Sequence, residues 1–280
     1  MTEWMDHSRF FLFPDGARVL YSNALFAELL GRFARIEREL GDAPAAVRLE
    51  QVQSRFVRAI NARLWNESAG RYDNLRLWGI ADERSSSEGN MLAVLGGVAP
   101  PERIGRIFDA IRTTNWRAAG STTITPPMTH VDAHNDHNFK VWPWWNAVEA
   151  RARFLHGDTA GAVHLLEAFS DTLEDPHYPG LVEELTTPDG VTEGGQAFVT
   201  AAGAYQDAIF SGLLGIDILQ AGRTRIRVTP NVPTDWQDWR AEVPLPQGVL
   251  RLIQANGYLR IEVTGDGAGL LSVRDTGIGI

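Results

Sequence analysis

The sequence predicts a mainly α protein, a partial toroid of helical hairpins followed by a small antiparallel β appendage. Apolar residues recur at three- and four-residue spacing over seven segments before Gly215, as on one face of a helix. Short turns with Gly or Pro join six of these segments into three pairs, and longer polar loops separate the pairs. Short turns at one end of the hairpins and long loops at the other are what a toroid of hairpins requires.

The first hairpin is expected over residues 20–65. Gly41 suits the left-handed cap that ends the first helix, Asp42 suits the N-cap of the second helix, and Pro44 suits its first turn. The apolar stripe of the first helix, over residues 20–41, consists of Leu20, Ala24, Ala27, Leu30, Phe33, Ile36 and Leu40. The second helix runs to about Trp65, and its stripe consists of Val52, Phe56, Ile60 and Leu64.

The same scheme returns twice and is followed by a single helix. The helices of the two further hairpins are predicted over residues 87–98 and 101–112, and over 144–156 and 159–173. The seventh helix spans roughly residues 197–214, and its buried face is formed by Phe198, Ala202, Tyr205, Ile209 and Leu213. We expect function on the long loops, because loops on a rigid scaffold present side chains freely; these loops are 66–86, 113–143 and 174–196.

After Gly215 apolar and polar residues alternate, which is typical of strands. The alternation covers residues 225–228, 251–253 and 259–263, and Asn256-Gly257 between the last two is a strong hairpin turn. The sequence therefore divides into a helical domain over residues 1–216 and a β-sandwich-like appendage over residues 217–280.

Composition excludes several functional classes. The formal net charge is −9 and there is no basic block, so neither nucleic acid nor an anionic membrane is an expected partner. The chain has no Cys, which excludes disulfides and thiolate chemistry. No apolar run approaches the roughly 20 residues of a membrane span and no signal peptide opens the chain, so we expect a cytoplasmic protein.

Carboxylates form two clusters far apart in the sequence. The first is Trp4-Met5-Asp6, and the second contains Glu183, Glu184, Asp189 and Glu193. Hydrolysis of a glycosidic bond needs one carboxylic acid to protonate the leaving oxygen and one carboxylate to activate water. The chain also has 9 Trp, whose faces stack on sugar rings, although a packed helical core uses Trp as well. Together these features suggest a glycosidase.

Four segments, in order along the chain, carry motifs of a known family. They are Trp4-Met5-Asp6 with residues 19–25, His137-Asn138 with Trp142-Pro143-Trp144, Glu184-Leu185 with Gln196-Ala197-Phe198, and residues 214–216 with 227–230 and Trp236. In this order they resemble the six-hairpin glycosidases, which have an (α/α)6 barrel, and most of all the amylo-α-1,6-glucosidase domain of glycogen-debranching enzymes and their bacterial relatives. Two positions depart from the family pattern: Phe139-Lys140 stands where the family has Gly, and Phe198-Val199-Thr200 replaces Trp-Ser.

The resemblance implies inverting hydrolysis of an α-glucoside-type linkage, with carbohydrate as substrate and without cofactor or metal. It implies that Asp6 is the general acid, beside an apolar wall from Trp4 that raises the pKa of its carboxyl. Glu184 is the implied general base, and Glu193 and Glu183 are the alternatives for that role.

The resemblance also implies that the chain is incomplete. The family barrel has twelve helices, so the seven predicted here correspond to the C-terminal part of a longer enzyme. An open toroid exposes apolar helix faces, and we therefore expect either an upstream segment or self-association at its open edge.

The sugar-binding wall is expected to consist of His137, Asn138 and Trp142. The other residues expected to contact substrate are Trp4, Tyr21, Asn23, Glu88, Glu193 and Gln196. Simpler structural roles are alternatives for some of these positions. Glu88 and the nearby Asn90 lie where a Ser-rich segment can cap the start of a helix. Of the tryptophans that follow Trp142, Trp144 or Trp145 suits packing in the core. Alternating His and Asp over residues 130–138 leave metal binding as an alternative for that loop.

Three rival functions remain at this stage. A non-catalytic carbohydrate-binding module that needs a partner segment is suggested by the missing helices. A glycoside phosphorylase of related fold would need a basic phosphate pocket, and residues 180–200 contain no Lys or Arg, which argues against it. An isoprenoid-handling toroid is disfavoured by the hydrophilic loops and by the lack of a paired aspartate-rich motif.

Overall fold

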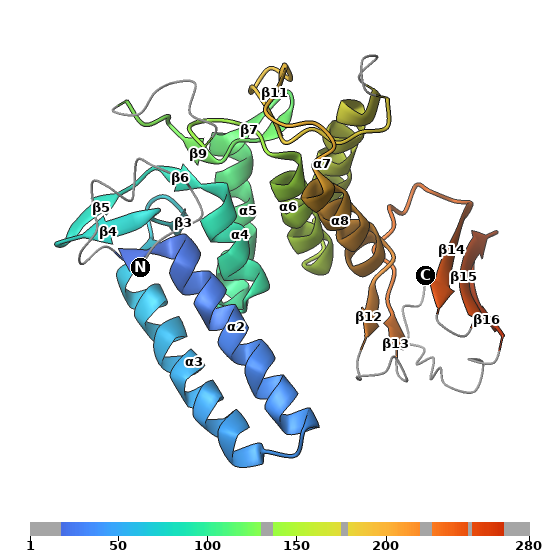
Figure 1. The fold of residues 1–280 in the computed structure, drawn as a ribbon, viewed down its shortest axis with the longest axis horizontal. Coiled ribbons are helices and arrows are strands. Elements are labelled where there is room, and N and C mark those ends of the chain that lie inside the picture. Colours follow the sequence, from blue (N-terminus) through green and yellow to red (C-terminus); the bar gives the residue numbers. More distant parts are fainter. Residues whose placement is uncertain (1–17, 130–136, 175–178, 219–225, 246–247, 266–280) are drawn as a thin grey trace.

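The computed structural model describes residues 18–129, 137–174, 179–218, 226–245 and 248–265. In these ranges it has seven α-helices, each within a few residues of a predicted segment (Figure 1). They are α2 (Leu20–Glu39), α3 (Ala43–Arg63), α4 (Ser87–Leu95), α5 (Pro101–Asn115), α6 (Pro143–Leu155), α7 (Thr159–Asp171) and α8 (Val199–Asp207). The 3-10 helix η1 (Thr172–Glu174) follows α7, and the π-helix η2 (Ala208–Leu213) continues α8. The predicted three hairpins and single helix are confirmed.

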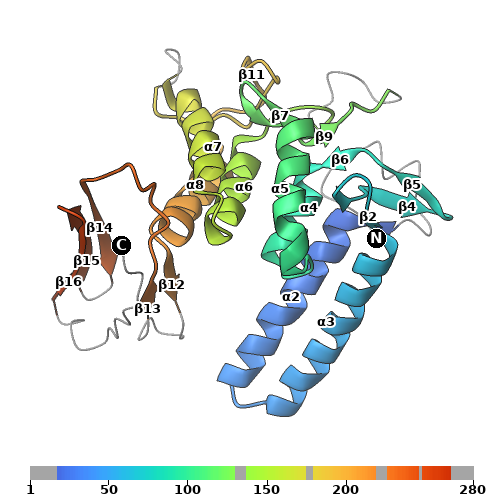
Figure 2. The same ribbon diagram turned by 180° about the vertical axis from the view of Figure 1, so that it is seen from behind.

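Alternate helices form a layer that we call the inner layer. Within it α2 packs against α4, α4 against α6, and α6 against α8. The second helix of each hairpin lies outside this layer, with α3 on α2, α5 on α4 and α7 on α6 (Figures 1 and 2). Because each hairpin reverses the chain, all four inner helices run in one direction and begin at the end that carries the long loops. This order is the one predicted for a partial toroid.

The predicted helix caps are confirmed. The Asp42 carboxylate accepts a hydrogen bond from the N–H of Ala45 at 2.9 Å and so caps α3, while Gly41 has φ +91°. Ser86 and Asp158 cap α4 and α7 in the same way. Side-chain caps and left-handed glycines thus set where the chain turns, as the sequence indicates.

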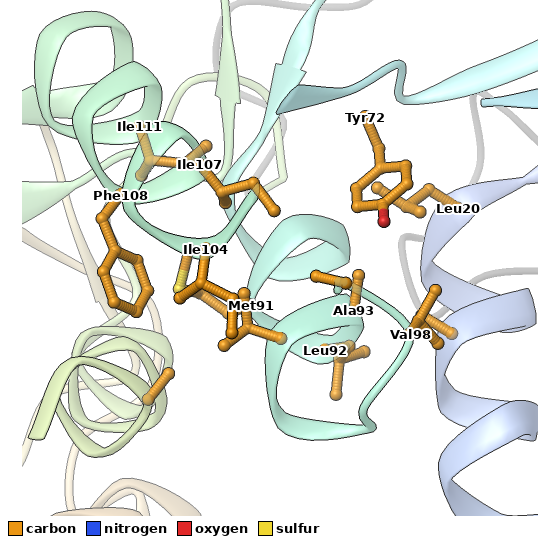
Figure 3. Close-up of a cluster of buried hydrophobic side chains, with 14 of the residues drawn as sticks. Leu20, Tyr72, Met91, Leu92, Ala93, Val98, Ile104, Ile107, Phe108 and Ile111 are labelled. Carbon is orange, nitrogen blue, oxygen red and sulfur yellow. The ribbon is translucent and has the colours of Figure 1, made fainter. Parts of the chain in front are cut away.

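Helix α4 lies at the centre of the main core. Every residue from Ser87 to Val94 is buried, because α2, α5 and α6 surround the helix. Figure 3 shows Leu20 and Tyr72 on one side of α4, and Ile107 with other residues of α5 on the other. A helix enclosed in this way carries apolar and small residues on all its sides. The start of α4 therefore has a rigid position, which matters for the site at that end.

The long loops contain short strands that the sequence did not reveal. These are β1 (Arg18–Val19) with β4 (Leu75–Leu77) and β5 (Ile80–Asp82), β2 (Trp65–Asn66) with β3 (Arg71–Tyr72), β6 (Ser85–Ser86) with β9 (Ile124–Thr125), β7 (Trp116–Arg117) with β8 (Gly120–Ser121), and β10 (Leu185–Thr186) with β11 (Thr192–Glu193). Strands of two or three residues are too short to show a period of two. Their pairing depends on how the helices hold the loop ends.

The C-terminal appendage is confirmed as antiparallel β structure. Its sheet has the order β14 (Trp239–Leu245), β15 (Gly248–Ala255) and β16 (Tyr258–Thr264), and β12 (Ile216–Ile218) pairs with β13 (Ile226–Val228) nearer the helices. Asn256 and Gly257 have φ of 53° and 77°, as in the predicted two-residue hairpin turn. Leu214, at the end of η2, packs on Leu250 and Leu252 and so connects the appendage to the helical domain.

The apolar stripe of α2 is only partly buried, which corrects the sequence interpretation. Its buried residues are Leu20, Ala24, Ala27, Leu30 and Ala34. Phe33, Ile36 and Leu40 are instead exposed, by 54%, 48% and 76%. Helical spacing identifies an apolar face but not what covers it, and no element in the described ranges covers this side of α2.

None of the helices in the described part of the chain is both long and apolar enough to cross a membrane.

Candidate active site

Backbone hydrogen bonds tie the loops together above the start of the inner layer. Val141 and Thr186 exchange two of them, with N···O distances of 3.0 and 2.8 Å. The carbonyl of Lys140 accepts from the N–H of Thr123 at 2.8 Å, and the carbonyl of Thr123 accepts from that of Ser87 at 3.2 Å. These bonds place the start of α4, the segment before α6 and the β10–β11 hairpin side by side, although they are far apart in the sequence.

Aromatic side chains connect the starts of three inner helices. The ring of Trp142, just before α6, stacks on His137 with centroids 5.1 Å apart and planes 7° from parallel, and its edge meets Phe198 before α8 at 6.0 Å. Trp145 of α6 meets Tyr21 of α2 edge-on at 5.8 Å. The fold thus stacks two of the residues expected to bind sugar, His137 and Trp142, on each other, and it sets a third, Tyr21, against Trp145 of α6. Trp142 and Trp145 also belong to the main core, so the core-packing alternative holds for Trp145.

Asn138 and Asn23 have local structural partners. The side-chain amide of Asn138 accepts from the N–H of Met128 at 2.7 Å and donates to its carbonyl at 3.0 Å. Asn23 donates to the carbonyl of Val19 at 2.7 Å and lines a cavity with Phe56, on the α3 side of α2. Asn138 therefore holds the loop that carries His137, and Asn23 faces away from α6.

Glu88 is a buried carboxylate at the start of α4. Its side chain accepts a hydrogen bond from Ser86 at 3.1 Å, and Ser86 also accepts from the N–H of Gly89 at 3.3 Å. The capping alternative is therefore confirmed for this segment. A helix N-terminus favours negative charge, which allows a carboxylate here despite its burial.

The β10–β11 hairpin presents the three carboxylates considered for the general base. Glu183 is buried and only 1% exposed, whereas Glu184 is half-buried. The N–H of Gly195 donates to the Glu184 carboxylate at 2.7 Å, and a Cβ on Gly194 would lie 2.9 Å from the same oxygen. The backbone of this glycine pair is therefore shaped around the Glu184 carboxylate, and the hydrogen bond fixes the position of that oxygen.

Glu193 has a different environment, and it reveals a residue that sequence reasoning missed. Its carboxylate forms an ion pair with Lys140, whose side chain is 7% exposed. The sequence argument against a phosphate pocket considered only residues 180–200, whereas the fold brings this cation from another loop beside them. Nothing in the spacing of Lys140 and Glu193 signals their contact, because it depends on the pairing of Val141 with Thr186.

Phe139 has a backbone conformation that residues other than glycine rarely adopt. Its φ is 65°, in the left-handed region that favours Gly, and the resemblance places a family Gly here. A residue other than Gly in this region costs roughly 1–3 kcal/mol and persists only where its surroundings hold it. The guanidinium of Arg117 lies 5.2 Å from the Phe139 ring centre, and Asn138 is anchored beside it.

Several predicted positions lie elsewhere. Gln196 is exposed on the β10–β11 side of α8, next to Gly195. Trp4, Asp6 and residues 130–136 of the metal-binding alternative lie outside the described residues. Among the residues that the structure does describe, no three His, Cys, Asp or Glu side chains are grouped so as to hold a metal ion.

Comparisons with known proteins agree with this architecture. No family model and no curated protein sequence matches the chain. A solved structure named as a sialidase superposes on 88% of this chain with a TM-score of 0.72 at 14% identity, and the match covers 25% of that structure. The GH78 family rhamnosidase of Bacillus sp. GL1 gives a TM-score of 0.66 at 18% identity, over 91% of this chain and 26% of its own. For the GH63 mannosylglycerate hydrolase of Thermus thermophilus the TM-score is 0.55 at 17% identity, and the match covers 68% of this chain and 48% of that structure.

The chain therefore spans between a quarter and about half of the length of these matched structures. Likeness at such low identity shows the fold alone: this chain shares with part of each of these structures an array of helical hairpins, and here the array is followed by a C-terminal β appendage.

Proposed function

We propose that this chain belongs to a glycoside hydrolase that cleaves an α-glucoside-type O-glycosidic bond with inversion of configuration. The observation that carries the proposal is the Glu184 carboxylate, which is held by the N–H of Gly195 at 2.7 Å on the same rim of loops as the stacked pair of His137 and Trp142. A half-buried carboxylate on a rim of loops that also carries aromatic side chains suits a base that activates water next to a sugar.

The environments of the three candidate carboxylates favour Glu184 as the base. A general base must be free to accept a proton and must reach a water molecule. Glu193 is already paired with the ammonium of Lys140, so its carboxylate is engaged by a cation. Glu183 is 1% exposed, which leaves little room for water at its carboxylate. Glu184 is half-buried and its position is fixed by a backbone N–H, and it meets both requirements.

In the proposed reaction Asp6 gives its proton to the leaving glycosidic oxygen as the bond to the anomeric carbon breaks. A water molecule attacks the opposite face of the sugar, and Glu184 accepts the proton that this water loses. His137 and Trp142 are 7% and 4% exposed and stack on each other, so in this proposal they form the packed back wall of the sugar site and do not offer a free stacking face. The likeness to debranching enzymes, which the resemblance suggested, belongs to this proposal as the substrate class to test first.

The direct test is an assay of the chain, alone and joined to any upstream segment, against nitrophenyl glycosides and malto- and isomalto-oligosaccharides. Proton NMR of the first product should show the anomer opposite to that of the substrate. A product of retained configuration would contradict single displacement. Turnover that requires inorganic phosphate would instead support the phosphorylase, for which Lys140 is a candidate anion ligand.

We expect Gly194→Ala to lower kcat/KM by about 10-fold or more. The new Cβ would lie 2.9 Å from the Glu184 oxygen, so the carboxylate must move, and displacements of about 1 Å can cost up to 100-fold. Gly79→Ala is the matched control, because Gly79 also has positive φ, at +87°, but a Cβ there would meet nothing within 4 Å. Equal activity of the two variants would reject the role of the glycine pair.

A further inference from the structure

A cavity of about 270 Å³ lies between the start of α2 and the C-terminal half of α3, and no residue of α6 lines it. Its apolar lining consists of Phe56, Ile60 and Leu64, which are four residues apart and so share one side of α3. Ile60 and Leu64 are 4% and 2% exposed, and the ring of Phe56 meets that of Phe26 of α2 edge-on at 5.0 Å. The floor of the cavity is therefore part of the packed hairpin. We call this space the α2–α3 cavity.

Three arginines line the same cavity. They are Arg18 of β1 and Arg55 and Arg63 of α3, and all three are exposed. Within the described part of the chain, no Asp or Glu lines the cavity and none forms an ion pair with these three guanidinium groups. Arg18 lies opposite Arg76 in the pairing of β1 with β4, and Arg76 is already paired with Asp73. The cross-strand neighbour of Arg18 is thus a second cation, an arrangement that is unfavourable without an anion nearby.

Local structure explains only one of the three charges. Arg63 lies in the last turn of α3, where the helix dipole favours a cation. Arg55 lies about two turns earlier, at 3.6 residues per turn, and Arg18 belongs to a strand, so the dipole accounts for neither. The chain as a whole has 35 acidic and 26 basic residues, so three cations without a carboxylate run against its overall charge.

We propose that the α2–α3 cavity binds a small amphipathic organic anion. Its carbon body lies on Phe56, Ile60 and Leu64, and its carboxylate or sulfonate group lies between the guanidinium groups at the mouth. Arginine suits both parts, because its aliphatic stem extends an apolar wall while its N–H groups donate to an oxyanion. The cavity is lined by the hairpin of α2 and α3 and not by the loops that carry Glu184, so this site does not depend on the proposed hydrolysis.

The experiment is a fluorescence titration of the full chain with two dyes that differ by one charge. Anilinonaphthalene sulfonate has the apolar body and the anionic group, and N-phenylnaphthylamine has the same ring system without the sulfonate. The anionic dye is expected to bind about 10-fold more tightly or better, because a hydrogen bond to a charged group is worth at least that factor. Decanoate should displace it, whereas decanol at the same concentration should displace it much less.

Paired variants locate the binding. Arg55→Met/Arg63→Met should raise the Kd of the anionic dye by about 10-fold and leave both the Kd of the neutral dye and the Tm unchanged, because these side chains are exposed and have no ion pair to lose. Arg48→Met/Arg58→Met removes the same charge from exposed positions of α3 that do not line the cavity, and it should have no effect.

Ala59→Trp tests the cavity itself. Ala59 lines the cavity but is exposed, so a large side chain there should narrow the space without disturbing the core and should weaken the binding of both dyes. Binding that Ala59→Trp leaves unchanged would place the dyes elsewhere, such as on the exposed apolar side of α2, and would overturn the proposal. Equal affinity for the two dyes, equal losses in the two double arginine variants, or no binding to the wild type would overturn it as well.

Discussion

Glu184→Gln is expected to lower kcat by about 100- to 10,000-fold, the usual contribution of a general base. The amide has nearly the shape of the carboxylate but cannot accept the proton of the attacking water. Its oxygen can still accept the hydrogen bond from Gly195, so substrate affinity should change little. The measurement is steady-state kinetics on the best substrate of the panel, with the Tm recorded for each variant.

Glu183→Gln and Glu193→Gln are the matched controls for this prediction. All three carboxylates belong to one hairpin, and each substitution removes one charge while keeping its size. Near-normal kcat in Glu184→Gln together with a large loss in Glu183→Gln would transfer the role of base to Glu183. Asp6→Asn should show a loss comparable to that of Glu184→Gln if Asp6 is the acid, and activity retained there would reject that assignment.

The second large effect is expected on stability, at Arg153. This guanidinium is 0% exposed and donates to the Glu149 carboxylate at 2.9 and 2.7 Å, and to the carbonyl of Phe108 at 3.1 Å. It also pairs with Asp158, the N-cap of α7. Arg153 therefore joins α5, α6 and the start of α7 through one buried group.

Arg153→Met is expected to lower the free energy of unfolding by about 3–5 kcal/mol, because it leaves Glu149 charged and 1% exposed without its main partner. Urea denaturation monitored by Trp fluorescence measures the change. The double variant Arg153→Met/Glu149→Leu should recover much of the loss, since an apolar pair needs no desolvation of charge.

An exposed ion pair of the same spacing provides the control. Arg35 and Glu39 of α2 also lie four residues apart, with side chains 57% and 37% exposed. Arg35→Met should change stability by less than about 1 kcal/mol, because solvent screens exposed pairs. Similar losses for Arg35→Met and Arg153→Met would show that the buried network is not the cause.

Most of the helical architecture was predictable from the sequence. The longer helices carry a periodic apolar pattern, and Asp42 and Gly41 mark a turn through chemistry that acts within a few residues. The Asn256-Gly257 turn was predictable for the same reason. The strands in the long loops were not, because pairs such as Val141 with Thr186 have no local signature.

For the candidate site, the sequence supplies a list of residues, which stays a prediction, but no basis for choosing their roles. Motif order pointed to His137, Trp142 and Glu184, and the fold places them on one rim of loops. Sequence could not separate Glu184 from Glu183, although their exposures differ greatly. It also missed Lys140, whose partner Glu193 lies on another loop.

The sequence by itself determined the helices, their turns and the change to β structure, because periodicity and capping are properties of neighbouring residues. Only the tertiary structure decided which faces are covered, so Ala34 is buried while Phe33 of the same helix is exposed. It likewise decided which carboxylate is held by a backbone N–H group and which by an ammonium. Burial and charge pairing arise between segments distant in the chain, and no local pattern encodes them.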